Sequence, residues 1–473
     1  MTATWADLRI RALIGLVLIA ASINAAWLKL TGGFPIQDAF HGGEFLAAAM
    51  AVLHQAPFEG DPFTIHGAVD FLPALAVSFF VSAPDYLIAH TLVIYPILSL
   101  FSVLLTMFAA LQIGRRLDAD PLLIIPFLAL VPFAVGWKDL FFALCLSVFA
   151  GIVPGRDSRG GGVAAQVLFG VVIAFGTYWS FNRGAAALLA FGPVTLWLAL
   201  QDRRFLISVA TALVSFVAIG AVLPGIGVVG YVENFLMLLE TASQWAYPPS
   251  RFGQAWTAAL SAAFAASAIA AFIVMRKRGP ERGHIALTAA LVIASAVYLK
   301  IGLGRIDYSH IVMASWLPLL IVSVSLRWDL VSPPQEWAKP FVSFMAAILS
   351  AAMAIFFTSR YGYAGHAMVL AIFVMVIATF VILLGVFLPP RGQCGVSLGI
   401  AVLAVAFAAS TPVVGVYKVA RGDFYYPLSP DALEALPAND AAVTEGILWA
   451  GKRIDQSGAN CVFDLANTGL VNA

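Results

Sequence analysis

Charged residues are scarce in this chain: they make up only 11% of its 473 residues, whereas hydrophobic residues make up 61%. An ordinary soluble domain has about 25% charged residues, so this chain lacks the polar surface that water requires. The net charge of +1 also lacks the basic excess typical of nucleic-acid binding. The composition therefore excludes those two classes and predicts a protein whose main solvent is lipid.

Cysteines and short ligand-binding motifs are also few. The three cysteines, Cys145, Cys394 and Cys461, are far apart in the sequence, which excludes a disulfide framework and a CxxC metal site. The chain has no GxxxxGK motif followed by Ser or Thr, so it is not by itself an ATP-driven pump. It has no HExxH motif, and its histidines lack the spacing of metal ligands. We therefore expect no cofactor, and the use of a divalent metal stays open without a motif that supports it.

Long apolar segments, by contrast, recur along most of the chain. A helix needs about 20 mostly apolar residues to cross the hydrocarbon core, and segments of this kind predict about thirteen spans over residues 1–410. Basic residues mark alternate breaks between these segments, which the positive-inside rule assigns to the cytoplasm. The main basic breaks are at Arg115 and Arg116, Arg156 and Arg159, Arg203 and Arg204, and Arg276 to Arg282.

The remaining breaks hold aromatic residues, histidines and isolated charges, and alternation places them on the outer face. They are residues 137–139, 178–183, 225–254, 304–310 and 359–366. After about residue 410 the composition becomes more acidic, which predicts a small outer tail over 411–473. The fold class expected is thus an all-α integral membrane protein with a cytoplasmic N-terminus and a C-terminus on the outer face.

One apolar segment does not fit a simple alternation. Gly67 to Ser82 is short and contains Asp70 and Pro73. If it crossed the membrane, the basic turn at Arg115 would lie outside, against the positive-inside rule. We therefore predict that the segment is an interfacial or re-entrant helix within a long first outer loop, residues 31–85.

The first outer loop carries the first candidate site. Asp38 and Glu44 are six residues apart, with His41 and two glycines between them. Glycine turns a chain readily, so the two carboxylates can converge. A carboxylate in this position can remove a proton from an acceptor hydroxyl. The alternative interpretation is that these acids only solvate the membrane surface.

The break at 304–310 carries the second candidate site. It contains Arg305, Asp307 and His310, and Lys300 precedes it. Charges near lipid cost about 2.5–3.5 kcal/mol each when they move toward the bilayer centre, so this concentration indicates a polar pocket. The planar fork of Arg305 suits a phosphate, because it donates two parallel charge-assisted hydrogen bonds. The alternative is that Arg305 and Asp307 neutralise each other at the interface.

Two other outer breaks carry further candidates. Arg183 follows an aromatic pair, and its guanidinium suits either a substrate phosphate or, by snorkelling, the phosphates of lipids. The segment 225–254 contains Trp245 and Tyr247, whose rings stack well on sugar faces. Such rings are also enriched at every membrane interface, so both interpretations stay open.

The architecture of the whole chain resembles that of the GT-C glycosyltransferases. These are multispan enzymes that use polyprenyl-phosphate-linked sugars, and they include the protein mannosyltransferases and the aminoarabinose transferases of lipid A. The residues that carry the resemblance are Asp38 to Glu44, Gly304 to His310 and the tail around Cys461 to Leu465. In the protein mannosyltransferases the first-loop acids are adjacent, whereas here they are separated, which leaves open which of them is the base.

The resemblance implies transfer of a sugar from a polyprenyl phosphate to a glycan, lipid or protein acceptor, at the outer face of a bacterial inner membrane. Asp38 or Glu44 would take the proton of the acceptor. Arg305, together with Arg183 or Lys300, would stabilise the leaving phosphate. The remaining candidates would contact the substrates: His41, Asp307, His310, Trp245 and Tyr247.

Two alternative functions remain. A transporter or flippase of lipid-linked glycans would need charged residues at several positions inside its spans, whereas the predicted spans are nearly free of charge. An O-antigen ligase or polymerase would place its active residues in a late outer loop. Glu233 and Arg251 would then matter more than Asp38.

Overall fold

The architecture is described by a computed structural model. It describes residues 8–31, 66–80, 93–154, 161–223, 227–241, 281–304 and 308–325, and a few single positions at 49, 264–265, 267–269 and 271–272. All regular secondary structure within these ranges is helical, which confirms the predicted all-α class for this part of the chain. The predicted tail over 411–473 lies outside the described residues.

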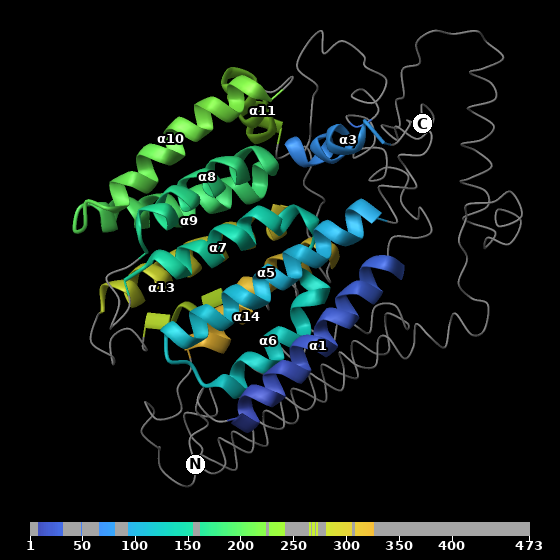
Figure 1. Ribbon diagram of the computed structural model, residues 1–473, viewed down its shortest axis with the longest axis vertical. Coiled ribbons are helices and arrows are strands. Elements are labelled where there is room, and N and C mark those ends of the chain that lie inside the picture. Colours follow the sequence, from blue (N-terminus) through green and yellow to red (C-terminus); the bar gives the residue numbers. More distant parts are fainter. Residues whose placement is uncertain are drawn as a thin grey trace, which may run out of the picture.

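Figure 1 shows the long helices packed into one bundle. They are α1 (Leu8–Thr31), α5 (Tyr95–Arg116), α6 (Pro121–Ala134), α7 (Leu140–Ile152), α8 (Val163–Trp179), α9 (Phe181–Ala199), α10 (Phe205–Val222), α11 (Val228–Thr241), α13 (Arg282–Gly304) and α14 (Tyr308–Ser325). In Figure 1, α1, α5 and α10 run in roughly the same direction. Three short elements accompany them: η1 (Ala68–Asp70), α3 (Leu72–Val77) and η3 (Trp137–Asp139).

Several of these helices are suited to a membrane. Among the described residues, α5, α10 and Arg282–Gly302 of α13 are each long and apolar enough to cross a bilayer. Leu123–Ala134 and Trp137–Ile152 pass the same test as a pair, which bends by 117°, so a fourth span is present if the pair is one broken span. The helices thus have the character of a membrane protein, and the total of about thirteen spans stays a prediction.

The bent pair differs from the sequence expectation of one full span on each side of residues 137–139. Helix α6 has 14 residues and α7 has 13, so each is about 20 Å long at 1.5 Å per residue. The hydrocarbon core is about 30 Å thick. Neither helix alone reaches across it, which leaves either a broken span or a re-entrant hairpin.

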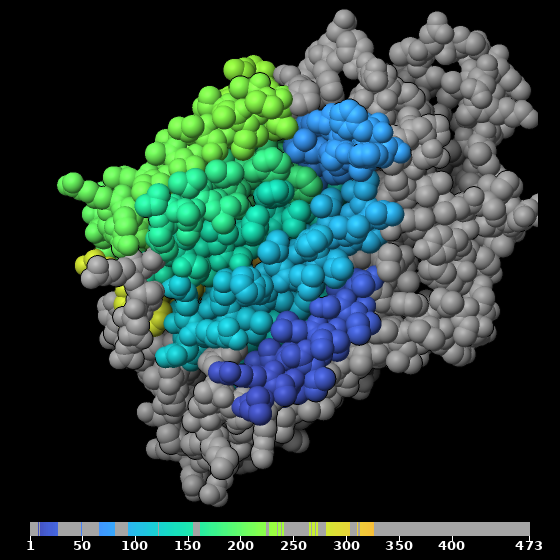
Figure 2. All heavy atoms as spheres, viewed as in Figure 1, coloured from blue at the N-terminus to red at the C-terminus, as the bar shows by residue number. Residues whose placement is uncertain are grey.

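Most of the long helices share one apolar core, and Tyr231 of α11 belongs to a second, smaller cluster. Helix α8 packs on α10, α5 on α7, and α13 on both α9 and α14. At its centre Phe142 of α7 lies with its ring centroid 5.8 Å from Trp316 of α14 and 5.0 Å from Tyr298 of α13. Large apolar side chains also point outward on α1, α5 and α10, for example Ile23 and Leu213, and these helices lie on the surface in Figure 2. Lipid, rather than water, would solvate such faces favourably.

The connections between helices gather at two ends of the bundle. At one end Arg116 Nη2 donates to the carbonyl of Gly151 at 2.9 Å, and His284 Nε2 lies 2.8 Å from the carbonyl oxygen of Arg116. We call this the basic end, because the turn with Arg115 and the start of α13 at Arg282 lie there. The opposite end holds the junction of α8 with α9 and the turn between α6 and α7, and we call it the site end.

Helix α11 lies within residues 225–254, which the sequence predicts to be a break on the outer face. Its Tyr231 and Phe235 are four residues apart and face the same way, with their rings stacked at 6.3 Å. Tyr231 packs edge-on against Tyr178 at 5.0 Å. The spacing of these two aromatic residues is a helical signal, which the general enrichment of aromatics at interfaces obscured.

The segment before α5 forms only short elements where it is described. Helix α3 has six residues, far fewer than the roughly 20 that a span requires. Its position at the membrane interface stays a prediction. Gly67 precedes η1 with φ of 112°, and a Cβ there would lie 2.8 Å from the carbonyl oxygen of Tyr178. Both the backbone conformation and the close approach therefore require glycine.

Candidate functional site

Buried charges gather at the site end. Among the described residues, the charged side chains that are buried are Asp70, Asp139 and Arg183, whose exposed fractions are 2%, 1% and 4%. A buried charge is costly unless it is paired and hydrogen-bonded, so the surroundings of these three residues define the candidate site. His66 and five other residues form a set that we call the polar cluster: His66, Asp70, Lys138, Asp139, Arg183 and Tyr298.

Asp139 and Arg183 form the centre of the polar cluster. Arg183 lies in the first turn of α9, and its Nε donates to Asp139 Oδ1 at 2.9 Å. The hydroxyl of Tyr298 donates to the same oxygen at 2.9 Å, and the N–H of Gly136 donates to Oδ2 at 3.0 Å. The carboxylate thus accepts three hydrogen bonds, which offset much of the cost of removing it from water.

The guanidinium of Arg183 also ties several helices together. Its Cζ lies 5.0 Å from the ring centroid of Tyr298 in α13, a cation–π geometry. Its Nη2 lies 3.2 Å from Met313 Sδ in α14. The structure therefore differs from the snorkelling interpretation, because this side chain points into protein. A role in binding phosphate stays a prediction, with Nε and Nη2 already engaged in this arrangement.

His66 and Asp70 form the second pair of the polar cluster. The N–H of His66 donates to Asp70 Oδ2 at 3.1 Å, and His66 Nδ1 lies 3.1 Å from Oδ1. The N–H of Phe181 donates to the carbonyl of His66 at 2.8 Å. This bond fixes His66 against the junction of α8 and α9, one helical turn or less from Arg183.

Burial lowers the pKa of His66 below its ordinary value of 6.5, and the positive charge of Lys138 acts in the same direction. Asp70 opposes this shift through its charge and its hydrogen bond, and Arg183 adds a smaller lowering effect. His66 is therefore neutral at neutral pH.

The lowered pKa of His66 predicts a pH-dependent stability. In the unfolded chain this histidine takes up a proton as the pH falls through about 6.5, whereas in the folded chain it resists protonation. Folding stability is thus lost progressively below about pH 6.5. We expect the unfolding temperature of the wild-type protein to fall between about pH 7 and about pH 5 more than that of His66→Gln, measured by thermal unfolding in detergent. An equal fall in both proteins would contradict the lowered pKa.

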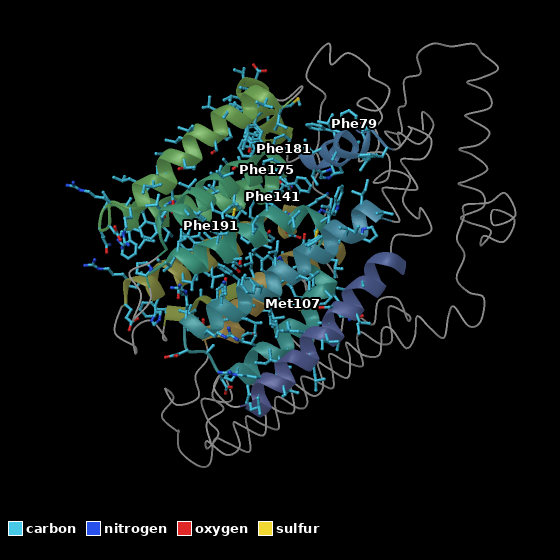
Figure 3. The ribbon with its side chains drawn as sticks, viewed as in Figure 1. Phe79, Met107, Phe141, Phe175, Phe181 and Phe191 are labelled. Atoms are coloured by element: carbon cyan, nitrogen blue, oxygen red, sulfur yellow. The ribbon has the colours of Figure 1, made fainter. Side chains whose placement is uncertain are left out.

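Aromatic side chains from η3, α7 and α8 pack beside the polar cluster. Trp179 Nε1 donates to the carbonyl of Trp137 at 3.4 Å. The ring of Phe141 lies 4.6 Å from Phe175 and 5.2 Å from Trp179, centroid to centroid. Phe141 of α7 and Phe175 of α8 are labelled in Figure 3. These rings lower the local dielectric beside the cluster, which strengthens its electrostatic interactions.

The described chain places three of the predicted site residues. Arg183 belongs to the polar cluster, Lys300 is exposed near the end of α13, and His310 is partly buried in the first turn of α14. The other predicted site residues lie outside the described residues: Asp38, His41, Glu44, Trp245, Tyr247, Arg305 and Asp307.

Sequence reasoning missed most of the polar cluster. Asp70 is an isolated carboxylate in an otherwise apolar segment. Above, it served only to predict that this segment does not cross the membrane. Lys138 and Asp139 stand in a predicted outer break without any motif. Tyr298 lies inside an apolar span, where nothing in the local sequence distinguishes it from a packing residue.

The cluster joins basic side chains to carboxylates, Arg183 to Asp139 and His66 to Asp70. In the part of the chain that the structure describes, no three His, Cys, Asp or Glu residues lie close enough to hold a metal ion. Comparison with known protein families, curated proteins and solved structures found no match. The resemblance to the GT-C glycosyltransferases therefore rests on the sequence features given above.

Proposed function

We propose that the chain is an integral membrane glycosyltransferase of the bacterial inner membrane, which moves a sugar from a polyprenyl phosphate to an acceptor at the outer face. The observation that carries this proposal is the concentration of buried charge at one end of the bundle. The first loop, with Asp38 and Glu44, joins described structure at Thr31 and at His66. His66 belongs to the polar cluster, so candidate base and candidate anion site are connected through this loop.

The chemistry of the proposed reaction matches these charges. Breaking the bond between an anomeric carbon and a phosphate releases an anion, which needs positive charge more than a proton donor. Lys138 and Arg183 supply positive charge from η3 and α9, and Arg305 follows the last residue of α13. Asp38 or Glu44 would accept the proton of the acceptor hydroxyl as an oxocarbenium-like sugar forms. A single displacement would invert the anomeric configuration.

The distribution of charge supports an enzyme over a flippase. A pathway for a lipid-linked glycan needs polar or charged side chains at several depths. The described helices instead keep their buried charges at the site end. Because basic turns favour the cytoplasm, the basic end would face the cytoplasm and the site end the periplasm.

Native mass spectrometry of the purified protein tests the proposal. We expect wild-type protein to carry a polyprenyl phosphate or its sugar conjugate, and Arg305→Ala to lose it, because the phosphate would lose its bidentate partner. The matched control is Arg204→Ala, which removes an arginine from the basic end and should retain the ligand. The mass of the bound species would also identify the sugar class.

Two outcomes would contradict the proposal. If only bulk phospholipid accompanies wild-type protein and Arg305→Ala alike, the donor is wrong and a transporter becomes the better interpretation. A sugar-transfer assay then separates the remaining enzyme classes. Activity that survives Asp38→Asn but is lost in Arg251→Ala would indicate an O-antigen ligase or polymerase instead.

A further inference from the structure

We propose that Arg183 is a positioning residue for the connection between α13 and α14, which carries Arg305 and Asp307. In this role Arg183 does not bind the donor phosphate itself. It holds the two helices on either side of the connection, so that Arg305 meets the phosphate in one arrangement. The assignment of Arg305 to the phosphate rests on the proposed function, whereas the contacts of Arg183 with both helices are features of the structure.

The connection is short, and the two helices approach each other closely beside it. Residues 305–307 join α13 to α14. A Cβ on Gly302, in the last turn of α13, would lie 2.7 Å from the Cβ of Ala314 and 3.1 Å from the carbonyl oxygen of His310. Only a residue without a side chain allows this approach of the backbones. A connection of three residues has few torsion angles of its own, so the packing of the two helices controls where it presents its side chains.

Arg183 contacts both helices less than two turns from this connection. Its Cζ lies 5.0 Å from the ring centroid of Tyr298 in α13, and its Nη2 donates to Met313 Sδ in α14 at 3.2 Å. Tyr298 precedes the last residue of α13 by six positions, and Met313 follows the first residue of α14 by five. Both contacts are thus within about 9 Å of the helix ends at 1.5 Å per residue. Arg183 bridges the helical hairpin where a small movement reaches the connection directly.

Asp139 holds the guanidinium in its bridging position. Its Oδ1 accepts hydrogen bonds from Arg183 Nε and from the hydroxyl of Tyr298, both at 2.9 Å. Its Oδ2 accepts from the N–H of Gly136 at 3.0 Å. Charge-assisted hydrogen bonds between buried groups are strong and directional. The bridge is therefore fixed from η3 as well as from the two helices.

The contacts of Arg183 favour positioning over direct binding of phosphate. A phosphate that binds a guanidinium side-on accepts two parallel hydrogen bonds, from Nε and from the neighbouring Nη. In Arg183, Nε already donates to Asp139 and Nη2 to Met313. Binding of this kind would have to displace both partners and leave the carboxylate of Asp139 without its charged neighbour, which is costly in a buried position.

Binding of farnesyl phosphate measures the consequence of the bridge. We expect isothermal titration calorimetry of the purified full-length protein to give a Kd about tenfold higher for Arg183→Lys than for wild type, because a displacement of about 1 Å greatly weakens an oriented contact. Lysine keeps a positive charge beside Asp139 but lacks the planar fork that reaches Tyr298 and Met313 together. Neutral farnesol is the control ligand, and its affinity should not differ between the two proteins.

A double-mutant cycle separates positioning from direct binding. If Arg183 acts through Arg305, Arg183→Lys should cause no further loss of affinity in Arg305→Ala protein. If Arg183 binds the phosphate itself, its loss should lower the affinity in that background too, and this outcome overturns the proposal. The matched control is Arg204→Lys, a change on an exposed turn at the basic end, which should leave the affinity unchanged.

Met313→Leu is a second variant, which keeps the test decisive if Arg183→Lys folds poorly. Leucine replaces methionine at nearly the same volume but offers no sulfur to Nη2 of Arg183. Because the side chain of Met313 is uncharged, it has no direct attraction for a phosphate. We expect its replacement to raise the Kd by about twofold to threefold, and this effect should also vanish in Arg305→Ala protein.

Hydrogen–deuterium exchange of the ligand-free protein distinguishes failure of this inference from failure of the proposed function. Arg183→Lys and Met313→Leu should speed amide exchange around residues 305–307, whereas Arg204→Lys should not. Unchanged exchange in both variants, or an unchanged Kd where Arg305→Ala raises it, would overturn the inference. If exchange is faster but Arg305→Ala binds farnesyl phosphate as tightly as wild type, the proposed donor site is wrong, and the support of the connection by Arg183 remains.

Discussion

Replacement of Arg183 by methionine should lower the free energy of unfolding by about 3–5 kcal/mol, because it leaves a buried carboxylate without its charged partner. Asp139 is 1% exposed and receives the Nε–H of Arg183 at 2.9 Å. The hydroxyl of Tyr298 and the N–H of Gly136 would still donate to it. These two neutral donors do not replace a full positive charge. The loss should appear as a lower midpoint in thermal or SDS-induced unfolding.

A double-mutant cycle isolates the pair. Asp139→Asn alone should also destabilise, since it strands the buried guanidinium. The combination of Asp139→Asn with Arg183→Met should recover part of the loss, because neither unpaired charge is then present. The control is Arg204→Met, which breaks an ion pair with Asp202 on an exposed turn and should not change stability measurably. A loss in Arg183→Met no greater than in this control would show that the buried pair contributes little.

Alanine at position 184 should destabilise the protein by roughly 1–3 kcal/mol through overpacking. A Cβ on Gly184 would lie 2.5 Å from Thr177 Cα and 2.8 Å from the carbonyl oxygen of Thr177. Both are backbone atoms of α8, so the helices would have to separate rather than rotate a side chain. Small residues at such contacts let helix backbones approach closely in membranes. Since Arg183 precedes this glycine, the change should also disturb the polar cluster.

Alanine at a matched glycine, Gly15, should change the stability in the opposite direction. Gly15 lies inside α1, and a Cβ there would meet no atom within 4 Å. Gly15→Ala should therefore stabilise by about 0.5–1 kcal/mol, because alanine loses less backbone entropy in a helix. Both variants are compared by the unfolding midpoint in the same detergent. Equal effects of the two substitutions would mean that the contact between α8 and α9 is not close-packed in solution.

The sequence by itself determined the solvent and the local structure of this protein. Lipid cannot hydrogen-bond a backbone, so long apolar segments must become helices, and their breaks must collect polar residues. The break at 137–139 became η3, and 305–307 separates α13 from α14. These features follow from properties of consecutive residues. They can therefore be predicted from composition and from the lengths of apolar segments.

The tertiary structure alone decided which charges meet. Asp139 bonds to Arg183, 44 positions away, and to Tyr298, 159 positions away. Local sequence shows the same pattern whether an arginine near a helix end reaches to lipid or points into protein, so Arg183 was ambiguous. Its burial, and the pairing of His66 with Asp70 beside it, depend on how α8, α9, α13 and α14 pack. The bilayer constrains each helix separately, whereas the polar cluster exists only because side chains from distant helices satisfy one another.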